Sequence, residues 1–194
     1  MNSKPILFRG EMVRAILEGR KTQTRRVVRV QPPSFPHDEP VKAAFCELDG
    51  KWKLLPGCSR RFKDSLFVFG KCPYGVPGDE LWVRETWGID ECDRTIYRAS
   101  TSSSDEHDLK HIIHAFRWRS SIFMPRRASR IKLRITDVRV ERLQDISEED
   151  AMAEGVLVVP DSTYKLGFKR IWQSIHANWD IPQWVWVVEF ERAV

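Results

Sequence analysis

Three segments of the chain repeat apolar residues at the spacing of an α-helix. Residues 11–18 form the first, and Gly19 ends it, because glycine readily takes the left-handed conformation that follows many helices. The second opens at 147–150 with a sequence that resembles a capping box, and Gly155 closes it. The third is 167–178, with an apolar stripe of Phe168, Ile171, Trp172 and Ile175.

Four other segments have the alternation or the β-branched, apolar composition of strands: 24–30, 80–87, 131–141 and 184–191. The alternation within 131–141 slips by one residue near Thr136 and Asp137, which indicates a β-bulge. Helices and strands do not follow the regular βαβ order of a Rossmann or TIM layout. The pattern therefore favours an α+β fold built around a small β-barrel, with three or four short helices.

Two stretches lack a clear period and are interpreted as insertions, at about 31–64 and 99–114. The second carries His107, His111 and His114 at helical spacing, which places three imidazoles on one face. No supporting carboxylate motif such as H-E-x-x-H accompanies them, so we expect no metal site.

The composition suits one domain with one core, because the chain has 194 residues, of which 42% are hydrophobic. The formal net charge of +5 favours an anionic partner, although the same charge also serves solubility alone. The cysteines form no C-x-x-C pair, which argues against a zinc ribbon; they are Cys46, Cys58, Cys72 and Cys92. We find no signal segment and no apolar run long enough to span a membrane, so we expect a cytoplasmic protein without a membrane partner.

The densest polar cluster lies at 20–26, at the junction of the first predicted helix and the first predicted strand. The usual signatures of nucleotide, serine-hydrolase and zinc-protease sites are missing. A solvated turn with a basic face would explain the cluster equally well. A second polar position is Glu85, which is in phase with the core residues Leu81 and Val83. Its carboxylate must be paired, face a cavity or be turned outward by a bulge.

The run Gly19-Arg-Lys-Thr-Gln-Thr24 with Arg26 resembles the G-x-K-x-x-E-x-R signature of the ASCH family, small β-barrels of the PUA-like superfamily associated with RNA. Thr24 replaces the usual glutamate, as in a bacterial subgroup that acts as N4-acetylcytidine amidohydrolases. That subgroup also has a glutamate after an L-x-x-[LI]-[TS]-E run, which is similar to Leu143-Gln-Asp-Ile-Ser-Glu148 followed by Glu154. Segments 72–79 and 81–87 resemble ASCH proteins of phages and prophages, most of which have no assigned activity.

The resemblance implies that Thr24 is a nucleophile, Lys21 its activator and Glu154 a general acid/base. A threonine hydroxyl is a poor nucleophile, and a lysine of ordinary pKa is almost fully protonated at neutral pH. The mechanism therefore requires a lowered pKa at Lys21, which burial and the charges of Arg20, Arg25 and Arg26 would supply.

The residues expected to contact substrate are Arg20, Arg26, Arg84, Glu85, Trp87 and Arg126. The expected partner is a cytidine-type nucleoside or RNA; nothing specifies DNA, and the reaction requires no cofactor. The alternative is a non-catalytic RNA-binding or host-interaction protein of phage origin. RNA cleavage ranks below both, because the sequence offers neither a histidine pair at the cluster nor a metal site.

Overall fold

The computed structural model describes residues 2–32, 41–47, 49–56, 65, 67–101, 117–158 and 160–193. Its main element is a five-stranded mixed sheet with the order β1-β6-β9-β10-β2. The strands are β1 (Ser3–Leu7), β6 (Glu80–Arg84), β9 (Lys132–Arg142), β10 (Trp184–Arg192) and β2 (Gln23–Val27). β1 pairs with β6 in parallel, and the other neighbours are antiparallel. β2 is thus an edge strand, and one of its edges is free of the sheet.

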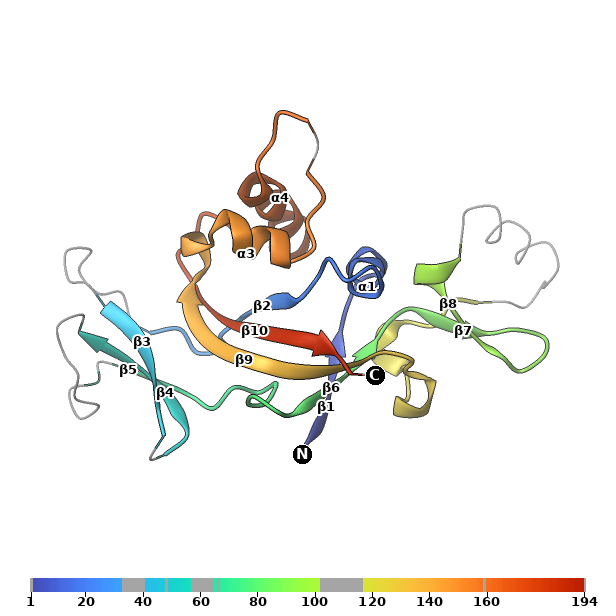
Figure 1. Cartoon of the computed structure of the whole chain (residues 1–194), viewed down its shortest axis with the longest axis horizontal. Helices are drawn as coiled ribbons and strands as arrows, with labels where there is room; N and C mark the ends of the chain where they lie inside the picture. The colour runs from blue at the N-terminus through green and yellow to red at the C-terminus, as the bar shows by residue number, and fades with distance from the viewer. Residues whose placement is uncertain are drawn as a thin grey trace.

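The helices are α1 (Gly10–Leu17), α3 (Glu148–Ala153) and α4 (Tyr164–His176). Figure 1 shows α3 and α4 together on one side of the five-stranded sheet, while α1 lies beside β2. The Ser147 side chain accepts a hydrogen bond from the Asp150 backbone N–H, which confirms the predicted cap of the second helix. The third helix begins earlier than predicted, because Thr163 caps it by accepting from Leu166 N–H.

β10 lies between β9 and β2, and its first five residues are apolar and buried because both faces of the strand are covered there. Trp184, Trp186 and Val188 point into the main core together with residues of β6 and β9. Val185 and Val187 point the other way, into a second core that α3 and α4 complete. The strand therefore holds the helical layer against the sheet, and it aligns β2 beside both.

The predicted bulge is confirmed in β9. Glu189 of β10 pairs with Asp137 and Phe190 pairs with Ile135, so Thr136 is the extra residue. The bulge lets one long strand keep apolar residues on its core face on both sides of the irregularity.

The sheet differs from the closed barrel that the sequence favours. Among the described strands, no pairing joins the two edges β1 and β2, so the sheet is open. The alternation of apolar residues records which face of a strand is buried, and it carries no information on closure.

Part of the predicted insertion at 31–64 is described, and it contains strands that its irregular pattern did not indicate. β3 (Val41–Cys46) and β4 (Lys51–Pro56) pair with each other, and β5 (Phe67–Gly70) joins them in a separate three-stranded sheet. Leu54 of β4 is fully buried in the main core. Figure 1 shows this sheet at one end of the molecule and a hairpin of β7 (Trp87–Ile89) and β8 (Thr95–Tyr97) at the other.

The second predicted insertion is described only at its start, where Arg98–Ser100 form a short 3-10 helix. Three further 3-10 turns lie at Ser121–Phe123, Arg126–Ala128 and Leu143–Asp145. The three histidines of the 99–114 segment lie outside the described residues. Within the described ranges, no helix is both long and apolar enough to cross a membrane.

Candidate functional site

The turn between α1 and β2 brings Lys21 against the end of α3. Gly19 has a φ of +76°, and the backbone N–H groups of Arg20 and Lys21 both donate to the carbonyl of Ala15, so the chain folds back on the helix. Lys21 then forms an isolated antiparallel bridge with Glu154, the residue that caps the C-terminus of α3. The predicted catalytic lysine and glutamate are thus joined through their backbones as well as their side chains.

The side chains of Lys21 and Glu154 form a buried ion pair. Lys21 Nζ donates to Glu154 Oε2 at 2.6 Å and to the Glu154 backbone carbonyl at 2.9 Å. The Lys21 side chain is 0% exposed and that of Glu154 is 5% exposed. Burial lowers the pKa of Lys21 below its ordinary value; Glu154 opposes this shift, while Arg26 and Arg25 reinforce it. The direction is the one that activation of a hydroxyl requires.

Arg25 makes a network of contacts with carboxylates that the sequence did not reveal. Its guanidinium is fully buried and reaches Glu154 Oε1 at 3.5 Å, Asp150 Oδ2 at 2.9 Å and Glu141 Oε2 at 3.1 Å. Arg139 also contacts Asp150 and Glu141, at 3.0 and 2.5 Å. This network ties α3 to β2 and β9, and it holds the second carboxylate oxygen of Glu154. The residue types gave no signal for it, because Arg25 is one of several arginines in the basic cluster.

Thr24 is buried and lines a pocket of about 300 Å³ that Glu154 also lines. We call this cavity the Thr24 pocket. Its apolar wall comes mainly from α4 and from Phe8; the α4 residues are Phe168, Ile171, Trp172 and Ile175. The volume is at the lower end of the range for small-molecule sites, which suits a ligand of nucleoside size.

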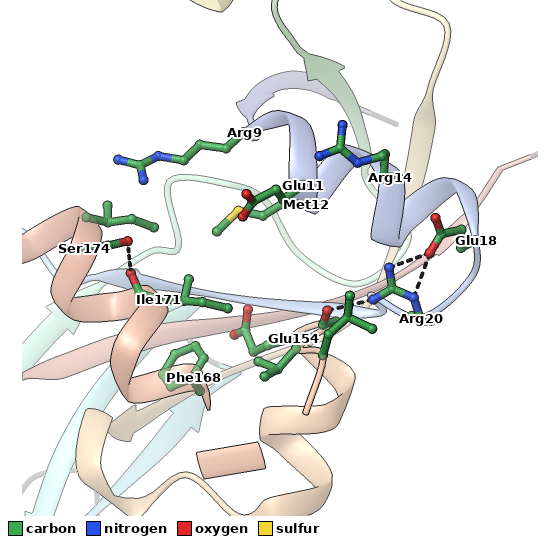
Figure 2. A pocket seen from close by; sticks show the side chains of 14 residues that line it. Arg9, Glu11, Met12, Arg14, Glu18, Arg20, Glu154, Phe168, Ile171 and Ser174 are labelled. Carbon is green, nitrogen blue, oxygen red and sulfur yellow. Dashed lines mark hydrogen bonds and ion pairs between the residues drawn. The ribbon is translucent and has the colours of Figure 1, made fainter. Parts of the chain in front are cut away.

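A larger pocket of about 590 Å³ adjoins it between α1 and α4, and we call it the α1–α4 pocket. Figure 2 shows Arg9 at the start of α1, Met12 within α1, Phe168 and Ile171 on α4, and Glu154 on the lower side of the pocket. The two pockets share six lining residues, which are Arg9, Met12, Glu154, Phe168, Ile171 and Ile175. Glu154 therefore stands where the two cavities meet.

Two of the predicted substrate-binding residues lie at these pockets. Arg26 lines the Thr24 pocket, with its guanidinium 5.2 Å from the centre of the Phe8 ring and Nη2 donating to the Leu7 carbonyl at 2.6 Å. Its buried Nε has no hydrogen-bond partner in the described part of the chain, which leaves a donor for a ligand. Arg20 lines the α1–α4 pocket, but it pairs with Glu18 and donates to the Gly155 carbonyl.

The other four predicted contacts line neither the Thr24 pocket nor the α1–α4 pocket. Glu85 is buried and forms a two-pronged ion pair with Arg130, at 2.9 and 3.0 Å, so its carboxylate is satisfied within the protein. Trp87 is buried in a small separate cluster with Met124 and Ala128. The half-buried Arg84 lies over the Trp82 ring, with its buried Nε unpartnered in the described part of the chain. Arg126 is exposed and lies 3.6 Å from Glu80.

His176, at the end of α4, is a pocket residue that the sequence did not single out. Its ring packs against Trp172 with the ring centres 4.4 Å apart. Burial, with help from Arg26 and Arg9, lowers its pKa below the ordinary value, so the imidazole is neutral at pH 7. The sequence signal was its position four residues after Trp172, on the apolar stripe of the helix.

Among the residues that the structure describes, no group of three or more His, Cys, Asp or Glu side chains is arranged to hold a metal ion. Comparisons with protein-family models, with curated proteins and with solved structures find no match to this chain.

Proposed function

We propose that the Thr24 pocket binds a cytidine-type nucleoside, free or within RNA, and hydrolyses an amide formed by its N4 amino group. The observation that carries this proposal is the buried 2.6 Å contact between Lys21 and Glu154, at a pocket that Glu154 and Thr24 line together. As part of it, we assign the chain to the ASCH branch of the PUA-like superfamily and to the cytoplasm. Support for that assignment comes from Gly19 and Lys21 in the turn between α1 and β2 and from Arg26 in β2.

Acylation of Thr24 is the first half of the reaction. Neutral Lys21 accepts the hydroxyl proton as Thr24 Oγ forms a bond to the acyl carbonyl carbon. The proton passes along the Lys21–Glu154 hydrogen bond, and Glu154 delivers it to N4 as the C–N bond breaks. The products are the free cytidine amine and an acyl ester on Thr24.

Deacylation regenerates the enzyme. Glu154, again a carboxylate, takes a proton from water while the water oxygen bonds to the ester carbonyl carbon. The proton returns through Lys21 to Thr24 Oγ as the ester bond breaks, and the carboxylic acid leaves. Arg25 holds the other oxygen of Glu154 in this scheme, so it is a positioning residue.

Release of acetate from N4-acetylcytidine, measured without added metal, tests the proposal. Thr24→Ala should lose activity by at least about 100-fold, because no other group replaces the nucleophile. Thr22→Ala is the matched control: it removes the same hydroxyl from an exposed position two residues away and should leave the rate unchanged. Full activity in Thr24→Ala would refute the mechanism.

A non-catalytic RNA-binding function is the second candidate, and the buried, unpartnered Nε of Arg26 in the described pocket favours it. In that case the wild-type protein binds cytidine or RNA but releases no acetate. Binding should then fall steeply with salt, and Arg26→Gln should weaken it far more than Thr24→Ala.

A further inference from the structure

A third cavity lies on the other side of the start of α1, and arginines dominate it. It has a volume of about 470 Å³. We call it the arginine pocket; it is lined by Arg9, Arg14 and Arg98, by the hydroxyl-bearing Thr86 and Thr101, and by Gly10, Glu11 and Ala99. Glu11 is the single acidic residue among these lining residues, so three positive charges face one negative charge.

Two of these arginines have no carboxylate partner in the part of the chain that the structure describes. The guanidinium groups of Arg9 and Arg14 make no ion pair or hydrogen bond with another described residue. Arg9 and Arg14 are both exposed, so their guanidinium groups are open to solvent and to a ligand. By contrast, the less exposed Arg25 and Arg139 each contact at least one carboxylate. Concave sites with uncompensated arginines attract anions, and guanidinium groups match the geometry of phosphate oxygens.

The arginine pocket adjoins the Thr24 pocket, because Arg9 and Thr86 line both. A ligand whose base enters the Thr24 pocket would therefore extend past these two residues toward the arginines. We propose that the arginine pocket is a phosphate subsite, and that the preferred ligand is a nucleotide or an oligonucleotide in place of a bare nucleoside. This inference rests on the proposed function for the identity of the base, but the binding of phosphate itself does not depend on catalysis.

The test compares the affinities of cytidine and cytidine 5′-monophosphate for the full chain by calorimetry. The nucleotide should bind at least about tenfold more tightly, the factor expected for a charge-assisted hydrogen bond. Arg14→Gln should remove most of that advantage while leaving cytidine affinity unchanged. Arg134→Gln, an exposed position on β9, makes the same change in net charge and should have no effect. A thermal melt establishes that each variant folds.

A short cytidine-containing RNA distinguishes the two sources of phosphate. If the subsite serves RNA, the oligonucleotide binds more tightly than the mononucleotide, and Arg14→Gln lowers the slope of log affinity against log salt by about one. Equal affinity of cytidine and its monophosphate in the wild type, or an undiminished advantage in Arg14→Gln, would overturn the subsite. If nucleotide binding depends on Arg14 but no acetate is released, the phosphate subsite is supported and only the proposed hydrolysis is refuted.

Discussion

The Lys21–Glu154 pair makes a quantitative prediction about stability. Replacing Lys21 by methionine removes the cation and keeps most of the side-chain volume, while Glu154→Gln removes the anion and keeps the shape. Each single change leaves a buried charge without its main partner, since the two side chains are 0% and 5% exposed. Removing one member of a buried pair costs about 3–5 kcal/mol of unfolding free energy.

The structure places both single variants toward the lower end of that range. In Glu154→Gln, the amine of Lys21 still reaches the backbone carbonyl of residue 154 at 2.9 Å, and burial already favours its neutral form. In Lys21→Met, the carboxylate of Glu154 keeps Arg25 at 3.5 Å. We expect each single variant to lose about 3 kcal/mol, and the double variant to lose less than the sum by about 2 kcal/mol.

Urea unfolding of the wild type, both single variants and the double variant at pH 7 gives this coupling energy. The matched control is the pair Asp90–Arg94, which has a similar contact distance of 2.8 Å but an arginine side chain that is 76% exposed. Its coupling should stay below about 1 kcal/mol. If the coupling of Lys21 to Glu154 is below about 0.5 kcal/mol, the two groups do not act as a unit, and the proton path assumed for catalysis loses its basis.

Three further predictions concern the surroundings of this pair. The folded state lowers the pKa of Lys21 below 10.5, so between the folded and unfolded pKa values the unfolded chain binds more protons. In that pH window, the free energy of unfolding of the wild type should therefore rise with pH relative to that of Lys21→Met. Urea titrations at several pH values measure this difference, and parallel curves for the two proteins would contradict the prediction. A Cβ at Gly155 would stand 2.8 Å from Lys21 Cβ, whereas a Cβ at Gly19 would meet nothing within 4 Å. Gly155→Ala should therefore lower the free energy of unfolding by about 2 kcal/mol more than Gly19→Ala, as measured by urea unfolding. Equal losses would show that backbone strain alone acts. Glu85→Gln should lower the free energy of unfolding by about 1–2 kcal/mol, because the Arg130 side chain that loses its partner is 25% exposed and stays hydrated. The KM for nucleoside should stay unchanged, and a raised KM would show that Glu85 contacts the substrate.

Local features of the chain were predictable because their causes lie within a few residues. The ends of the first two helices follow from Gly19, Ser147 and Gly155, and each takes its expected conformation or hydrogen bond. The bulge at Thr136 was visible as a slip in the alternation, since one extra residue reverses the face of every residue after it. The candidate residues Lys21 and Glu154 came from a resemblance, and the structure brings them into contact.

Other features depended on which distant segments meet, and the sequence by itself determined none of them. The open sheet and the added strands at 41–56 follow from long-range pairing, which alternation does not encode. The sequence predicted that Glu85 contacts substrate, whereas the fold pairs its carboxylate with Arg130. It predicted that the charge of Arg25 acts on the pKa of Lys21, but not that acidic side chains from β9 and α3 surround Arg25. The sequence shows which side chains are charged. Tertiary packing decides whether each charge has a partner within the protein, and therefore whether it can bind a ligand.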